Sequence, residues 1–211
     1  MIDAALLPLQ RRLLQPFARR LVALGATADR ITIAGFCLGV LSLPALAFGA
    51  YGLAAALIVL NRIMDGLDGA VARLSGPTDR GAFLDIALDF VFYALVPLGF
   101  ALLAPAQNAL PAAVLIAAFV GTGSSFLAFA TLAAKRGMTA TAYPAKGIHY
   151  LGGLTEGAET ILLFLAMCLF PSVFPALAYG FAALCAMTTL SRWRQGWVLL
   201  APEQISGQNA T

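Results

Sequence analysis

Three long stretches without a charged side chain constrain the fold of this chain more than any other feature. They cover residues 31–61, 90–134 and 160–191, which are 31, 45 and 32 residues long. A helix that crosses the hydrocarbon core of a bilayer needs about 20 predominantly apolar residues. Charged residues make up 11% of the chain, against about 25% in ordinary soluble domains. The sequence therefore predicts an all-α integral membrane protein, and it excludes a disordered chain, a basic nucleic-acid binder and a typical soluble enzyme.

Turn-forming residues divide the apolar stretches into individual helices. Glycine and proline at 49–52, 105–111 and 171–175 predict three breaks. Arginines among apolar residues near 4–24 predict an amphipathic helix that lies along the membrane surface. Six transmembrane helices are expected to follow it, near 31–49, 53–73, 81–104, 111–134, 154–170 and 176–195.

The positive charges lie on one side of this map. Twelve of the 13 basic residues fall in the N-terminal segment, in the connections after the second and fourth spans, or at the end of the last span. The remaining one, Arg62, lies within the second span. Since positively charged loops stay in the cytoplasm, both termini are expected there, in the inner (plasma) membrane. The expected division is a juxtamembrane segment (1–30), a six-helix transmembrane catalytic domain (31–200) and a polar C-terminal tail (201–211).

Four carboxylates interrupt the apolar pattern around the second and third spans. Asp65 and Asp68 lie on the cytoplasmic half of the second span, and Asp85 and Asp89 at the start of the third. At 100° per residue, each pair projects from one stripe of its helix. The short connection makes the two helices antiparallel neighbours. We therefore expect the four acids to face one another across a cytoplasmic cleft, because ionisable groups at such depths normally face water or an ion.

This arrangement favours divalent metal ions. Four carboxylates repel one another unless protons or cations neutralise them. Oxygen ligands without histidine or cysteine suit Mg²⁺, Mn²⁺ or Ca²⁺, and paired metal ions are typical of phosphoryl transfer. Arg73, one turn closer to the cytoplasm, is placed to contact a phosphate. A cation- or proton-coupled transporter is the alternative from another class, because intramembrane acids also serve as relays.

The residues of this region stand at fixed spacing, in the pattern Asp65-x2-Asp68-Gly69-x2-Ala72-Arg73-x7-Gly81-x3-Asp85-x3-Asp89. This pattern resembles the signature of the CDP-alcohol phosphatidyltransferase family. A juxtamembrane helix followed by six spans is also that family's architecture. Thr27–Thr32 (TADRIT) is similar to the segment before the family's first span, commonly T-P-N-x-x-T. Ala28 and Asp29 depart from that form.

The resemblance implies an enzyme of phospholipid biosynthesis that cleaves a CDP-linked alcohol at its pyrophosphate. The phosphoalcohol is transferred to an acceptor hydroxyl, and CMP is released. The implied ligands of two divalent ions, Mg²⁺ or Mn²⁺, are Asp65, Asp68, Asp85 and Asp89, with Asp89 also the general base. Contacts to the CDP group are implied for Asp68, Gly69, Ala72, Arg73 and Gly81. The implied partners are CDP-diacylglycerol or another CDP-alcohol, a polar alcohol, membrane lipids and a second copy of the chain in a homodimer.

Several residues are candidates for the acceptor site, although positive-inside topology alone also explains the basic ones. A phosphorylated polyol would need cations, as in family members that use glycerol 3-phosphate or inositol phosphate. Two acids that share a helix face would suit hydroxyls, an amine or an arginine partner. The candidates are Arg136, Lys146, Glu156, Glu159 and Arg192. We expect CDP-diacylglycerol as donor, and the alternative within the family is a CDP-choline or CDP-ethanolamine phosphotransferase acting on a lipid hydroxyl.

Overall fold

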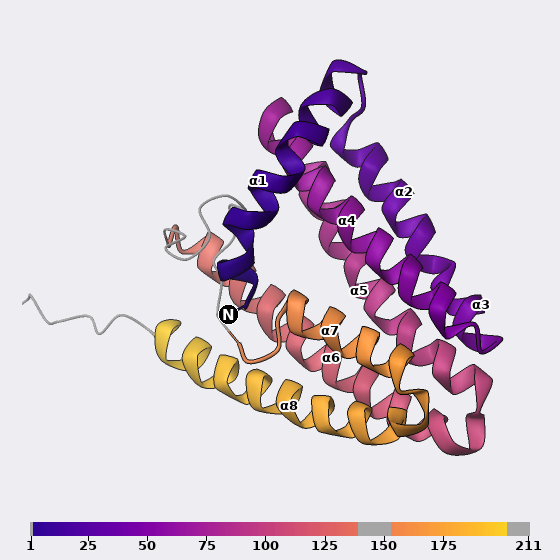
Figure 1. Cartoon of the computed structure of the whole chain (residues 1–211). Helices are drawn as coiled ribbons and strands as arrows, with labels where there is room; N and C mark the ends of the chain where they lie inside the picture. Colours follow the sequence, from indigo (N-terminus) through magenta and orange to yellow (C-terminus); the bar gives the residue numbers. More distant parts are fainter. Residues whose placement is uncertain (1, 139–152, 202–211) are drawn as a thin grey trace, which may run out of the picture.

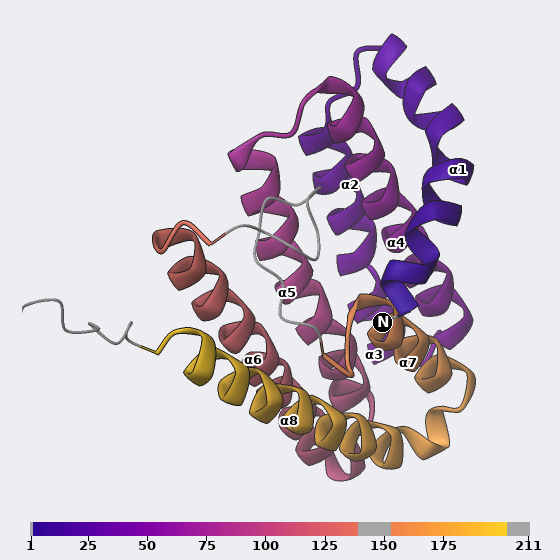
Figure 2. The same cartoon turned by 90° about the vertical axis from the view of Figure 1, so that its left-hand side faces the viewer.

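The computed structural model describes residues 2–138 and 153–201, and within these ranges the chain consists of helices joined by short turns, without strands. Figures 1 and 2 show α2 and α4 side by side, with α1 lying along α4, and α6 beside α8. The elements in chain order are α1 (Ile2–Ala23), α2 (Ala28–Val40), α3 (Ser42–Ala47), α4 (Tyr51–Ser75), α5 (Asp79–Leu103), α6 (Pro105–Lys135), α7 (Gly157–Leu169), the 3₁₀ turn η1 (Pro171–Val173) and α8 (Phe174–Leu199).

Within the described ranges, four helical segments are long and apolar enough to cross a membrane. They are Ala28–Ala47, Asp79–Leu103, Pro105–Lys135 and Pro171–Leu199. The helix α4 is 25 residues long, but it carries charged residues along its second half. The helix α7 has 13 residues, or about 20 Å at 1.5 Å per residue, whereas the hydrocarbon core is about 30 Å thick. The all-helical membrane fold is confirmed, and the number of six spanning helices stays a prediction.

Prolines explain two differences from the expected helix boundaries. The first expected span, 31–49, is formed by α2 and α3 together, with a break between them. Pro44 has no N–H to donate to the carbonyl group of Val40, the last residue of α2. The expected turn over 105–111 is wrong, because α6 begins at Pro105. Proline is favoured in the first turn of a helix, where its missing N–H would have no helical partner.

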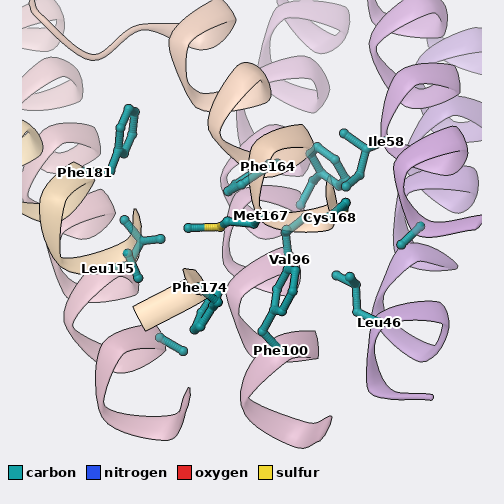
Figure 3. Packing of buried hydrophobic residues seen from close by; sticks show 14 of the residues in the cluster. Leu46, Ile58, Val96, Phe100, Leu115, Phe164, Met167, Cys168, Phe174 and Phe181 are labelled. Carbon is teal, nitrogen blue, oxygen red and sulfur yellow. The ribbon is translucent and has the colours of Figure 1, made fainter. Parts of the chain in front are cut away.

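The apolar core lies among α3, α4, α5, α6, α7 and α8. Figure 3 shows Met167 of α7 between Leu115 of α6 and Ile58 of α4, and all three side chains are fully buried. The rings of Phe100 in α5 and Phe174 in α8 stack with centroids 4.5 Å apart. Because dense packing leaves few voids, these contacts fix the relative positions of the helices.

The helix α2 packs against both α4 and α5, and glycines permit the close approach. A Cβ atom on Gly35 would lie 2.7 Å from the Cβ atom of Met64 in α4. One on Gly39 would lie 2.8 Å from the ring of Phe92 in α5. Larger residues would therefore separate α2 from its neighbours, and α2 would no longer close the space between α4 and α5.

A three-residue connection, 76–78, joins α4 to α5. Gly76 has φ +94°, a conformation that residues with a Cβ atom rarely adopt. Thr78 caps α5, because its Oγ1 atom accepts a hydrogen bond from the backbone N–H of Gly81 at 3.0 Å. The connection keeps the carboxylate-bearing ends of the two helices close together.

Candidate active site

A pocket where α2, α4 and α5 meet contains the four aspartates of the predicted site. It is lined by Thr32, Gly35 and Phe36 of α2, Asn61, Arg62, Asp65 and Asp68 of α4, and Asp85, Leu88 and Asp89 of α5. Residues up to 57 positions apart in the chain therefore contribute to one site. The two carboxylate pairs come from different helices, as the stripes on the two spans require.

Three of the carboxylates are close enough to bind one metal ion together. One oxygen atom each from Asp65, Asp68 and Asp85 lies within 4.8 Å of the other two. Oxygen atoms that bind one Mg²⁺ at about 2.0–2.1 Å are at most about 4.2 Å apart, so a small side-chain movement is enough to complete the geometry. The donor set consists of carboxylate oxygens alone, which fits a hard divalent cation. These three residues are therefore the ones that could hold it.

Asp68 receives a hydrogen bond from another helix. The Oγ1 atom of Thr32 in α2 lies 2.6 Å from Oδ2 of Asp68 and 3.0 Å from the carbonyl oxygen of Ala28. Asp68 is buried, so this contact orients a carboxylate that water reaches poorly. Thr32 closes the TADRIT segment, and its contact gives that segment a direct part in the geometry of the site.

Asp89 has a different partner, which sequence reasoning missed. The Nη2 atom of Arg62 lies 2.5 Å from Oδ1 of Asp89 and 3.4 Å from Oδ1 of Asp65. The guanidinium group also lies over the rings of Phe92 and Tyr93, 5.7 and 5.8 Å from their centroids. Arg62 precedes Asp65 by three residues on the same helix face, and this spacing indicates the contact with Asp65 but not the one with Asp89.

Of the residues expected to contact CDP, Asp68 lines the pocket, whereas Gly69, Ala72, Arg73 and Gly81 are not among its lining residues. A Cβ atom on Gly69 would lie 3.3 Å from Nη1 of Arg73. Arg73 is exposed, while Ala72 and Gly81 are half-buried. A substituent on Gly69 would therefore displace the arginine, so the glycine leaves room for a charged side chain of its own helix.

Asp29, one of the two departures from the family's pattern, connects α2 to α5. Its Oδ2 atom accepts from Nε of Arg80 at 2.8 Å and lies 2.5 Å from Nη2. Its Oδ1 atom would lie 3.2 Å from a Cβ atom on Gly81. The aspartate therefore forms an ion pair, and the absence of a side chain at Gly81 leaves space for it.

Arg192, a candidate for the acceptor site, is buried between α6 and α8. Its Nη1 atom donates to the carbonyl oxygen of Thr122 at 3.0 Å, and its guanidinium carbon lies 5.8 Å from the centroid of the Phe126 ring. A Cβ atom on Gly153 would lie 3.2 Å from its Nη2 atom. Arg192 is therefore a buried residue with partners in α6, and it is not a solvated cation at the membrane surface.

Arg136 lies elsewhere, at the end of α6. It donates to the carbonyl oxygens of Leu200 and Ala201, at 2.6 and 3.3 Å. Cations near a helix C-terminus satisfy carbonyl groups that lack a helical partner, and Arg136 does so for α8. Lys146 lies outside the described residues.

Glu156 and Glu159 form a capping box at the start of α7. The backbone N–H of Glu156 donates to Oε2 of Glu159 at 3.2 Å, and the Glu156 side chain accepts from the backbone N–H of Glu159. This cap explains why α7 begins at Gly157, three residues later than expected. Capping boxes carry a glutamate three residues after the cap, and that spacing was the signal in the sequence.

The match to known proteins covers the whole site. A model of the CDP-alcohol phosphatidyltransferase family matches residues 26–193. Inner membrane protein YnjF of Escherichia coli (strain K12) is 55% identical over 200 residues, which cover 95% of this chain and 97% of that protein. An archaetidylinositol phosphate synthase of Methanothermobacter thermautotrophicus is 30% identical over 164 residues, covering 75% and 73%.

Solved structures share the fold. The phosphatidylinositol phosphate synthase of Mycobacterium tuberculosis in complex with manganese and citrate has a TM-score of 0.71 at 21% identity, covering 92% of this chain and 93% of that one. The same enzyme with CDP-DAG bound has a TM-score of 0.67 at 24% identity, covering 94% and 100%. At these identities the likeness establishes the helical architecture.

Proposed function

The chain belongs to the CDP-alcohol phosphatidyltransferase family, and from this premise we propose that it transfers a phosphatidyl group from CDP-diacylglycerol to a polar alcohol. Membership makes it a membrane enzyme of phospholipid biosynthesis, so the transporter alternative is not retained. The observation that carries the proposal is the group of Asp65, Asp68 and Asp85 oxygens within 4.8 Å of one another. Carboxylates this close together can bind a divalent cation, and a pyrophosphate is the natural further ligand of such a cation.

We assign two divalent ions, Mg²⁺ or Mn²⁺, to Asp65, Asp68, Asp85 and Asp89. Bound ions would neutralise the pyrophosphate and the charge that develops on its oxygens. Asp65, Asp68 and Asp85 supply an all-oxygen donor set, and Thr32 orients Asp68. The manganese in the Mycobacterium tuberculosis structure is consistent with this choice.

Asp89 is the proposed general base. It accepts the proton of the acceptor hydroxyl, and the hydroxyl oxygen forms a bond to the phosphorus atom that carries the diacylglycerol. The bond from that phosphorus to the bridging oxygen breaks, and CMP leaves with the electron pair. Asp89 lies in the pocket with the other carboxylates, which supports its part in the reaction, since a base must lie within hydrogen-bond reach of the proton.

The CDP group is proposed to lie over the adjoining turn of α4 and the first turn of α5. Asp68, Gly69, Ala72, Arg73 and Gly81 form this surface. Gly69 and Gly81 carry no side chain, and Arg73 is an exposed cation beside them. A nucleotide can approach the backbone closely at glycine positions, and arginine suits phosphate contacts.

The acceptor is proposed to be a phosphorylated polyol, such as inositol phosphate or glycerol 3-phosphate. Arg192 is the main candidate for its phosphate, because it is a buried cation on the helix α8 and arginine suits phosphate contacts. Arg136, Lys146, Glu156 and Glu159 remain further candidates. The names of the Methanothermobacter and Mycobacterium relatives agree with a phosphorylated inositol.

We further propose an inner-membrane location, cytoplasmic termini, a cytoplasmic active site and a homodimer. The one-sided distribution of arginine and lysine supports the orientation. The apolar helices and the name of the Escherichia coli relative support the location.

The test is an assay of CMP release with purified protein, radiolabelled CDP-diacylglycerol, Mn²⁺ or Mg²⁺ and a panel of free and phosphorylated polyols. We expect CMP and a labelled phospholipid with a phosphorylated polyol, and neither product in EDTA. Release of CMP only from CDP-choline or CDP-ethanolamine, with a lipid hydroxyl as acceptor, would favour the soluble-donor enzyme. No CMP from any donor would refute the proposal.

A further inference from the structure

We propose that Arg62 is a positioning residue that acts as an internal counter-ion at the active site, so that the chain binds one divalent cation tightly before the donor arrives. The inference rests on the proposed function and deepens it. It divides the four carboxylates into a group of three, whose oxygen atoms are close enough to bind one ion, and Asp89, which makes the shortest contact with Arg62.

The contacts of Arg62 support this division. Its Nη2 atom lies 2.5 Å from Asp89 on α5, compared with 3.4 Å from Asp65 on its own helix. Asp65, in turn, belongs to the group of three whose oxygens lie within 4.8 Å of one another, and Asp89 does not. The shorter contact therefore falls on the one carboxylate that is outside that group.

The side chain of Arg62 is half-buried and held by several contacts, unlike a flexible side chain on the surface. Its side chain is 19% exposed, and its Nε atom donates to Oδ1 of Asn61 at 3.2 Å. Asn61 is buried, and its Nδ2 atom donates to the carbonyl oxygen of Gly35 in α2 at 3.0 Å. The rings of Phe92 and Tyr93 support the guanidinium group from α5. Contacts from all three pocket helices thus hold the guanidinium group of Arg62 in place.

Charge balance sets the expected number of ions. Four ionised carboxylates and one guanidinium carry three net negative charges. One divalent ion reduces these to a single negative charge, whereas a second ion would leave a net positive charge in a poorly hydrated pocket, which is unfavourable. The pyrophosphate of a CDP-linked donor brings the negative charge that compensates for the second ion. Mg²⁺ and Mn²⁺ commonly bind to proteins together with substrate phosphates in this way.

The experiment is a Mn²⁺ titration of the full chain in detergent, in which electron paramagnetic resonance measures free Mn²⁺ without and with CDP. We expect one tight ion per wild-type chain without CDP, and a second when CDP is added. Arg62→Met should bind the second ion about tenfold more tightly without CDP, because a positive charge next to its ligands has been removed. Arg62→Lys, which keeps the charge, should behave like wild type.

The matched control is Arg194→Met, which removes an exposed arginine from α8 and should leave the titration unchanged. Asp89→Asn provides a second test if Arg62→Met does not fold: the tight ion should remain, since Asp89 lies outside the group of three. Two results would overturn this inference while CMP release still supports the proposed function. One is two tightly bound ions in wild type without CDP, and the other is unchanged affinity for the second ion in a folded Arg62→Met variant. Absence of both Mn²⁺ binding and CMP release would refute the proposed function itself.

Discussion

The two ends of α4 and α5 are built in opposite ways. At one end, Asp65 and Asp85 face each other in a polar pocket. At the other, Ile58 and Phe100 are completely buried in an apolar core. Less than two helical turns separate Ile58 from Arg62, the first charged residue of α4. The same two helices therefore carry the candidate active site along one part of their length and the apolar core along another.

This contrast shows how a membrane enzyme tolerates an unstable arrangement of charges. Like charges in a pocket between helices destabilise the fold until cations neutralise them, so the carboxylate end contributes little to stability by itself. Stacked and interdigitated rings at the core end hold the helices in position. Substitutions at the two ends should therefore have separable effects, on turnover at one end and on unfolding at the other.

The largest expected effect is that of Asp89→Asn on turnover. Loss of the proposed base should reduce kcat by about 10²–10⁴-fold, and donor binding should remain measurable, because Asp65, Asp68 and Asp85 still offer three carboxylates to an ion. The CMP-release assay and equilibrium binding of CDP-diacylglycerol measure the two quantities. Asp79→Asn, at an exposed position in the first turn of α5, is the control. Normal turnover in Asp89→Asn would show that the base has been assigned to the wrong residue.

Phe100→Ala should produce the largest effect at the core end. Deleting a buried aromatic side chain typically costs about 3–5 kcal/mol in the free energy of unfolding, and the stacking contact with Phe174 would be lost. Mn²⁺ affinity of the folded fraction should remain near the wild-type value. Denaturant unfolding in detergent, with exposed Phe48→Ala as control, provides the measurement. A large loss of Mn²⁺ affinity at full folding would contradict the separation of the two ends.

Thr32→Val should have a smaller effect, confined to the pocket. The variant keeps the shape of the side chain but removes the hydroxyl that contacts Asp68 at 2.6 Å. Hydrogen bonds to charged groups contribute about 1.5–3 kcal/mol, so we expect at least about a tenfold decrease in kcat/KM. Thr131→Val removes a comparable hydroxyl from an exposed position on α6 and should be neutral. Equal losses in both variants would rule out a specific role for the Thr32 contact.

The smallest effect is expected for Arg80→Met, at the rim of the pocket. Arg80 is 79% exposed in its ion pair with Asp29, and exposed ion pairs contribute about 0–1 kcal/mol. The unfolding free energy should fall by less than about 1 kcal/mol, with little change in turnover at moderate salt. A loss of turnover comparable to that of Thr32→Val would mean that the start of α5 must be held more firmly than its exposure suggests.

Much of the helical map could be predicted, because it depends on local properties of the sequence. Long charge-free stretches indicate the apolar helices. The spacing of Asp65 and Asp68, and of Asp85 and Asp89, follows the helical period, and the structure brings these residues to one pocket. The start of α6 was missed because proline can either end a helix or occupy its first turn. Local sequence alone does not decide between these two roles.

The pairings across helices could not be predicted. Nothing in the period of α4 indicates that Arg62 contacts Asp89 on α5 more closely than Asp65 on its own helix, since that depends on the angle between the helices. The ion pair between Asp29 and Arg80 likewise depends on how α2 and α5 are placed relative to each other. By contrast, the capping box of Glu156 and Glu159 is a local pattern, and it could have been recognised from its spacing.

The order of the pocket residues along the chain has a consequence for biosynthesis. Every residue that lines the pocket lies between Thr32 and Asp89, whereas the core requires α7 and α8, which are made last. Contacts between segments close in sequence form at a lower entropic cost than contacts between distant ones. The proposed metal site can therefore assemble while the ribosome is still extending the chain, before the aromatic packing that later secures it.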